Sequence, residues 1–180
     1  MDEIDHRIQL GKRVFLGSLE GKALSWIVLF KSKGELLLLC EQAVGESSYE
    51  EIASSVTDYL ESFYMECFTE EEKCKIGYFK RNAYSEACDR ITLLNAMEAS
   101  FFLEGEEGAE NGLNLGNRLL SPHAALGKGW WLCDVFKDQA AYVDCEGVIN
   151  LEKKTERLLV RPMLIYSLMQ KSTKDMEIDK

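Results

Sequence analysis

Apolar residues begin the chain in three short stretches that are separated by glycine-containing turns. Residues 8–16 and 24–30 are rich in β-branched and aromatic side chains, and residues 36–39 are consecutive leucines. Runs of this length are typical of strands, and an uninterrupted apolar run suits a strand that is buried on both faces. The pattern predicts a three-stranded antiparallel meander whose third strand spans residues 35–40.

The spacing of apolar residues then changes from that of a strand to that of a helix. Ser48 and Glu51 have the spacing of a capping box, in which each side chain binds the backbone N–H of the other residue. After them, apolar residues recur at helical spacing and form one stripe, made of Ile52, Val56, Tyr59, Leu60, Phe63 and Cys67. The cap signature repeats at 69–72 and 95–98. We predict one helix over 48–67 and two short helices ending near residues 76 and 102.

The last part of the chain returns to the pattern of strands. Predicted strands cover residues 90–94, 130–133, 140–143, 148–151 and 158–164. Pro162 lacks a backbone N–H, so the last segment is either an edge strand or a strand that begins at the proline. Residues 105–129 contain six glycines, and long connections of this kind are usually functional or mobile.

These elements predict an α+β fold with a twisted, mainly antiparallel sheet and two or three helices. A chain of 180 residues has the length of one domain, and we expect residues 1–172 to form it, with 173–180 as a flexible polar tail. The longest apolar run is far shorter than the roughly 20 residues of a membrane helix, and the N-terminal residues are acidic. We therefore expect a cytoplasmic protein.

Acidic residues are concentrated in the middle of the chain. The net charge is -10, and residues 41–110 hold 17 acidic against 5 basic residues. This balance argues against direct binding of nucleic acid, which depends on lysine and arginine. One explanation is a solvated helical surface. The other is an acidic partner face on the predicted helices, made of Glu50, Glu51, Asp58, Glu61, Glu70 and Glu71.

The cysteines, histidines and carboxylates form no recognisable catalytic or metal site. The six cysteines include no Cys-x-x-Cys pair, and His6 and His123 are far from them in sequence, so the spacing of a zinc site is absent. A nucleophile made of Cys133 or Cys145 with His123 lacks an orienting third group. Carboxylates at 134 and 138, and at 144 and 146, lack the pattern of a calcium loop. We expect reduced thiols, no metal, no cofactor and no catalytic activity.

The order of short motifs resembles an uncharacterised domain family that is frequent in Gram-positive gut bacteria and their phages. The match runs from about residue 10 to 168 and includes Arg-Ile-Thr-Leu-Leu-Asn, Trp-Trp-Leu, Ala-Ala-Tyr-Val-Asp and Val-Arg-Pro. That family is distantly similar to the C-type-lectin-like fold of formylglycine-generating enzymes and hypervariable ligand-binding proteins. The resemblance implies a C-type-lectin-like α+β domain with paired terminal strands and long binding loops, and no established activity.

The chain also departs from this family pattern. Where the family has Arg-Ser-Pro after the tryptophans, this chain has Cys133, Asp134 and Val135. The copper-binding cysteines of formylglycine-generating enzymes have no counterpart here, so their chemistry is not carried over. We expect Arg161, in the Val-Arg-Pro motif, to be a structural residue held by an ion pair.

Aromatic residues beside the glycine-rich segment form the first candidate binding surface. Neighbouring strand residues point to opposite faces, so we expect one of Trp130 and Trp131 in the core and the other on the surface. We predict a non-catalytic recognition module that binds a protein partner through Trp130, Trp131, Tyr142, Asn114, Asn117, Arg118 and His123.

Two alternatives belong to other functional classes. The first is an acidic inhibitor or nucleic-acid mimic whose acidic face blocks the basic groove of a nucleic-acid-handling enzyme. A phage-encoded inhibitor would be one example. The second is an oxidoreductase or hydrolase, which would need a metal or an activated cysteine that the sequence does not supply.

Overall fold

Strands and helices alternate irregularly in the computed structural model, which describes residues 9–32, 34–53, 56–79, 89–104, 119 and 126–168. The strands are β1 (Arg13–Leu19), β2 (Lys22–Ser32), β3 (Glu35–Cys40), β4 (Gly45–Ser48), β5 (Ile91–Thr92), β6 (Trp130–Phe136), β7 (Gln139–Val143), β8 (Ile149–Lys153), β9 (Arg157–Val160) and β10 (Met163–Ser167). The helices are α1 (Tyr49–Ala53), α2 (Val56–Cys67), α3 (Glu70–Lys75) and α4 (Ala96–Glu104).

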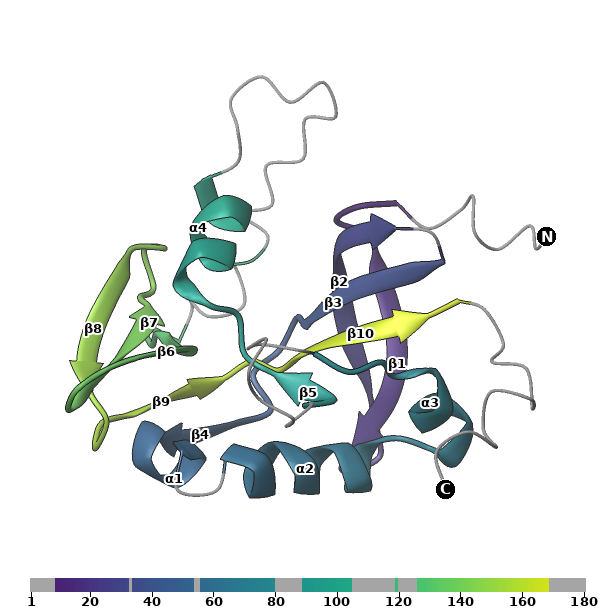
Figure 1. The fold of residues 1–180 in the computed structure, drawn as a ribbon, viewed down its shortest axis with the longest axis horizontal. Coiled ribbons are helices and arrows are strands. Elements are labelled where there is room, and N and C mark those ends of the chain that lie inside the picture. The colour runs from purple at the N-terminus through teal and green to yellow at the C-terminus, as the bar shows by residue number, and fades with distance from the viewer. Residues whose placement is uncertain are drawn as a thin grey trace.

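The strands divide between two five-stranded sheets (Figure 1). The first sheet has the order β1-β2-β3-β10-β5 and the second the order β4-β9-β6-β7-β8. All pairings are antiparallel except that of β6 with β9. The predicted α+β class with mainly antiparallel pairing is confirmed, and the prediction of one sheet is wrong.

The first sheet contains the predicted meander of β1, β2 and β3. β10 pairs with the other side of β3, from Met163 opposite Leu39 to Ser167 opposite Glu35. The resemblance implies paired terminal strands, but β2 and β3 lie between β1 and β10. Because β3 has a strand on each side and is covered on both faces, its continuous leucine run is buried or half-buried throughout.

The turn between β1 and β2 is shorter than predicted, because the predicted strands left residues 17–23 for it. β1 continues through Gly17 to Leu19, and the turn residues Glu20 and Gly21 have positive φ angles of 51° and 77°. Gly17 also has a positive φ of 70°, and a Cβ at this position would lie 2.7 Å from the carbonyl oxygen of Cys67. The glycine therefore lets β1 pass close to the end of α2.

Two chain segments cross side by side between the sheets. Residues 41–44 lead from β3 to β4, and residues 161–162 lead from β9 to β10; we call these two segments the crossover. The N–H of Cys40 donates to the carbonyl of Pro162, and that of Val44 to the carbonyl of Val160, each at 2.9 Å. The predicted strand 158–164 is therefore two strands in different sheets, and Pro162, which cannot donate to a ladder, lies between them.

A fully buried arginine holds the crossover together. Arg161 Nε donates to the carbonyl of Cys40 (3.1 Å) and Nη1 to that of Leu119 (2.8 Å), and Cζ lies 4.8 Å from the ring centroid of Trp130. Burial lowers the pKa of Arg161 to about 10, so the side chain stays charged at neutral pH. No ion pair of Arg161 is found among the described residues: backbone carbonyls bind Nε and Nη1, and the buried Nη2 has no hydrogen-bond partner.

Local capping signals fix the helix starts. Glu51 N–H donates to Ser48 Oγ (3.1 Å), and the capping boxes predicted at 69–72 and 95–98 are both formed. The helix predicted over 48–67 is described as α1 and α2, with residues 54 and 55 outside the described ranges. None of the helices described is long and apolar enough to cross a membrane.

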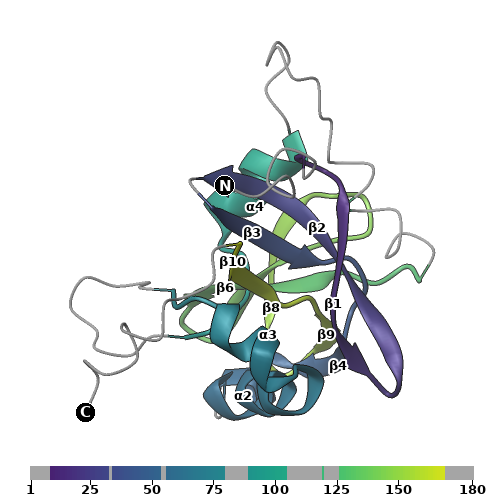
Figure 2. The same cartoon turned by 90° about the vertical axis from the view of Figure 1, so that its right-hand side faces the viewer.

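The helices cover the sheets and create two apolar clusters. α2 lies against the first sheet on its lower side in Figures 1 and 2, where Phe63 and Phe68 pack near Trp26. α4 lies against β6, β7 and β8 and forms the second cluster with residues such as Ala99 and Leu132. Each sheet is therefore buried on both faces over much of its area.

Replacement of the buried arginine should cost much more stability than replacement of an exposed one. Arg161→Ala leaves two buried carbonyls unpaired and creates a cavity, so we expect a loss of about 3–5 kcal/mol in the free energy of unfolding. Arg157→Ala, four positions earlier, removes an exposed ion pair with Glu51 and should cost about 0–1 kcal/mol. Urea denaturation of both variants measures the difference, and equal losses would contradict the role of Arg161.

Candidate functional site

Both tryptophans of the predicted aromatic surface are fully buried. They point to opposite faces of β6, as expected, but each face is covered. Trp131 packs against Tyr49 of α1, with ring centroids 5.4 Å apart, and its Nε1 donates to the carbonyl of Ser47 (2.9 Å). Trp130 faces the cluster beneath α4, where Arg161 lies over its ring. The prediction that one of them is exposed is wrong, because a sheet covered on both sides has no outer face at this point.

The other residues of this predicted surface give it little support. Tyr142 is half-buried, its ring centroid lies 6.3 Å from that of Trp131, and burial raises the pKa of its hydroxyl. Asn114, Asn117, Arg118 and His123 lie outside the described residues, as do most of residues 105–129. Of the described residues of this predicted surface, the two tryptophans belong to the core and Tyr142 lies at its margin.

Three of the predicted acidic residues form local ion pairs. Glu51 Oε2 accepts hydrogen bonds from Ser47 Oγ (2.8 Å) and Arg157 Nη1 (2.8 Å). The hydrogen bond from Ser47 is the main reason why the pKa of Glu51 is lowered. Glu70 and Glu71 pair with lysines three and four positions later on α3. These contacts are worth little at exposed sites, but they reduce the local excess of negative charge.

Other acidic side chains on the helices form no ion pair with a described residue. Glu50, Glu61 and Glu66 are exposed, and the salt bridges of the described residues involve none of them. Glu61 and Glu66 share one face of α2 with Met65, whose side chain is 55% exposed. The side chain of Asp58 lies outside the described set. The predicted acidic partner face did not include Glu66, although helical spacing places Glu66 outside the apolar stripe.

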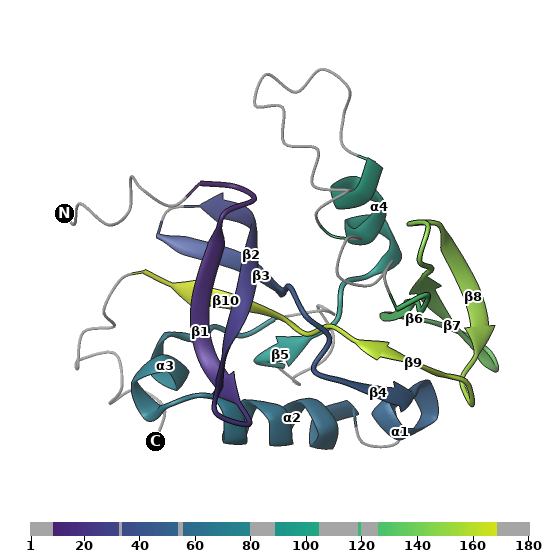
Figure 3. The same ribbon diagram turned by 180° about the vertical axis from the view of Figure 1, so that it is seen from behind.

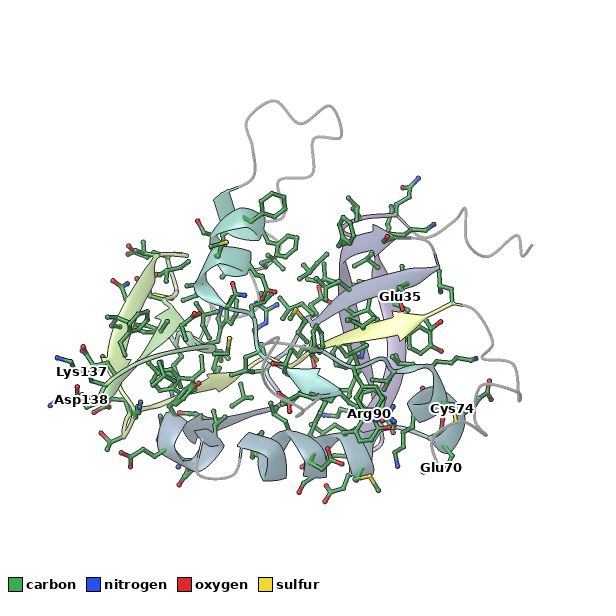
Figure 4. All side chains as sticks on the ribbon, viewed as in Figure 1. Glu35, Glu70, Cys74, Arg90, Lys137 and Asp138 are labelled. Carbon is green, nitrogen blue, oxygen red and sulfur yellow. The ribbon has the colours of Figure 1, made fainter. Side chains whose placement is uncertain are left out.

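We define the acidic face as the exposed carboxylates of α1, α2 and α3, namely Glu50, Glu61, Glu66, Glu70 and Glu71. Oxygen-tipped side chains project from the outer side of these helices, away from the sheets, and Glu70 marks the α3 end (Figure 4). Residues 49–75 hold eight acidic and two basic residues. The arrangement gives a negative surface with an exposed methionine on α2.

Two of the four carboxylates considered for calcium binding, Asp134 and Asp144, accept hydrogen bonds from backbone groups. Asp134 Oδ2 accepts from the N–H of Ala96 at the start of α4 (2.6 Å). Asp144 Oδ1 accepts from the N–H groups of Glu146 and Val148, each at 2.9 Å, and closes the turn before β8. Within the described ranges, no three histidine, cysteine or acidic residues are grouped so that they could hold a metal ion.

The cysteines occupy different environments. Cys40 and Cys67 are buried, and burial raises the pKa of Cys40 to about 12. Cys133 and Cys145 are half-buried, and Cys74 is exposed on α3. The histidine proposed as a base, His123, lies outside the described residues.

Comparisons of the chain with protein-family models, with curated proteins and with solved structures found no match.

Acid should weaken the cap that Glu51 provides. Its folded-state pKa is lowered, so its contribution to stability is fully present above the ordinary value of 4.5 and is lost as the pH falls through the lower folded-state value. We expect wild type to exceed Glu51→Gln in unfolding free energy at neutral pH, with the difference disappearing in acid. Urea denaturation between about pH 7 and pH 2.5 tests this. A Glu61→Gln control with the same pH dependence would contradict it.

The fluorescence of the native protein should report only buried tryptophans. The chain has three tryptophans, and Trp26, Trp130 and Trp131 are all fully buried. We expect blue-shifted emission that iodide quenches weakly until the protein is unfolded in urea. Quenching of about one third of the native emission is the result expected if one tryptophan were exposed, and it would contradict this arrangement.

Proposed function

We propose that this protein is a non-catalytic binding protein whose acidic face docks onto a basic surface of a partner protein. The observation that carries the proposal is the set of exposed carboxylates on the outer side of the helices, of which Glu50, Glu61 and Glu66 have no ion-pair partner among the described residues. A surface of one charge attracts an oppositely charged partner and accelerates its association at low salt.

A second observation favours a protein as the partner. Met65 lies between Glu61 and Glu66 on the exposed side of α2 and is 55% exposed. An exposed, flexible apolar side chain with carboxylates on either side of it is typical of protein–protein interfaces, where apolar contacts give affinity and charges give orientation. A partner that combines lysine or arginine with a small apolar depression would complement this surface.

The burial of both tryptophans favours the acidic face over the aromatic surface as the binding site. An interface built on Trp130 and Trp131 would require the exposure of core residues. The acidic face needs no rearrangement, since its side chains already project into solvent. In its finer form the proposal is an inhibitor or nucleic-acid mimic that occupies the basic groove of a nucleic-acid-handling enzyme. The C-type-lectin-like relationship is likewise a proposal, supported by the order of motifs.

Charge reversal on α2 should abolish partner binding. Glu61→Lys with Glu66→Lys changes the centre of the acidic face, and Glu35→Lys with Asp138→Lys makes the same change of charge at exposed positions outside the three helices. Glu35 is labelled on the first sheet in Figure 4. We expect tagged wild type and the control to retain the same basic protein from a nuclease-treated lysate of the native host. The α2 variant should retain none of it.

The salt dependence of partner retention distinguishes this proposal from the alternatives. Retention through the acidic face should fall by about tenfold or more between low and high salt, because the attraction between exposed charges is screened. A partner that survives high salt and binds the α2 variant as well as wild type would contradict the proposal. It would direct attention to an apolar surface elsewhere on the molecule.

A further inference from the structure

β8 forms an open edge of the second sheet. It pairs with β7 over its whole length, from Ile149 opposite Val143 to Lys153 opposite Gln139, and it is the last strand in the sheet order. Figures 1 and 3 show it at the outer limit of the molecule, on the side away from the first sheet. A strand in this position presents backbone groups on which another strand can form.

The hydrogen bonds at both ends of β8 show which backbone groups point outward. Asp144 N–H donates to the carbonyl of Val148, and Lys154 N–H donates to that of Asp138. In an antiparallel pair the hydrogen-bonded residues alternate, so the even-numbered residues of β8 face β7. The N–H and C=O groups of Ile149 and Leu151 therefore point away from the sheet, and no described residue binds them.

The same alternation limits the open edge at its C-terminal end. Lys153 N–H also points outward, but Glu152 Oε1 accepts a hydrogen bond from it (2.9 Å). The carbonyl of Lys153 accepts from Glu156 N–H (3.0 Å). Four backbone groups on Ile149 and Leu151 remain unbound by any described residue, which is the length of edge that a short extended segment can cover.

The two faces of the edge differ in chemistry. Leu151 lies opposite Ala141 on the face that α4 covers, and it is 45% exposed. Ile149, on the same face, is half-buried and packs against the cluster beneath α4. The apolar side chains of an added strand would therefore lie beside Ile149 and Leu151 on this face.

The opposite face of the edge is polar and acidic. Asn150 and Glu152 lie opposite Tyr142 and Ala140 of β7 and point away from α4. The exposed Glu146 lies in the turn that precedes β8. A side chain of an added strand that lies opposite Glu152 would be favoured if it were basic.

We propose that the β8 edge binds an extended segment of a partner protein, in antiparallel pairing, with the order basic, apolar, polar, apolar. These four residues lie opposite Glu152, Leu151, Asn150 and Ile149. Antiparallel pairing lets the segment exchange both hydrogen bonds with Ile149 and both with Leu151, and places its apolar side chains toward α4. The site shares no residue with the acidic face, although Glu50 N–H donates to the carbonyl of Lys154, which follows β8 (3.0 Å).

The probe is a blocked peptide with lysine, valine, threonine and valine at its centre and glycine-serine ends. Its titration into isotopically labelled protein, followed by NMR, should shift the amides of Ile149 and Leu151. We expect weak binding, with a Kd of about 100 μM, because the segment is short and flexible. A peptide with the same residues in scrambled order should bind at least about tenfold more weakly, which shows that the gain comes from the pattern and not from charge.

Two substitutions at one position separate backbone pairing from side-chain contact. Leu151→Pro removes an outward N–H without removing a hydrogen bond to β7, since proline is tolerated on such an edge. It should abolish the shifts. Leu151→Ala keeps the N–H and should weaken binding only about threefold. The spectrum of each free variant verifies that it is folded.

Glu152→Lys provides a further test that does not depend on tolerance of proline. It places like charges opposite each other, and it should weaken binding of the lysine peptide by about fivefold or more. The double α2 variant, Glu61→Lys with Glu66→Lys, should bind the peptide as wild type does, so failure of the acidic face and failure of the β8 site can be distinguished.

Several outcomes would overturn the proposal. These are equal binding of the ordered and scrambled peptides, shifts that fall on the acidic face, and a folded Leu151→Pro variant that binds like wild type. Sedimentation equilibrium of the free protein adds one more. A dimer that Leu151→Pro dissociates would show that the edge is occupied by a second copy of this chain and not by a partner segment.

Discussion

The crossover carries polar backbone through the core between the two sheets, and the hydrogen bonds of Arg161 satisfy part of that backbone. Arg161 binds the carbonyls of Cys40 and Leu119, which are 121 and 42 positions away in sequence. The carbonyl dipoles, the ring of Trp130 and the charge of the buried Glu41 carboxylate favour the charged form of this side chain and partly compensate for its lost hydration. One side chain thus fixes where β3, β9 and β10 meet, and with them the positions of both apolar clusters.

The features that the sequence predicts correctly depend on neighbouring residues. The meander follows from apolar runs separated by turns, and the capping boxes at Ser48, Thr69 and Asn95 need only residues three positions apart. The division into two sheets depends on distant contacts, which no local pattern contains. Strand alternation placed Trp130 and Trp131 on opposite faces, but it could not show that α1 covers one face and α4 the other.

The same distinction applies to the acidic face. The excess of negative charge is visible in the composition, and helical spacing identifies most of the exposed carboxylates. The sequence does not show that the Glu51 carboxylate accepts hydrogen bonds from Ser47 and Arg157, since Arg157 is 106 positions away. Nor does it distinguish β8 from β7, because both have the pattern of a strand. Which of them lies at the edge follows from the order of the sheet alone.

The pairing of β10 with β3 has a consequence for how the chain folds as it is synthesised. β3 is the most apolar strand of the first sheet, and its partner begins at Met163, more than 120 positions later. Until that segment leaves the ribosome, one side of β3 has no neighbour, and closure of the sheet requires a long and entropically costly loop. The nascent protein therefore carries an unpaired leucine-rich strand edge until β10 has been synthesised, and such an edge is prone to non-native association.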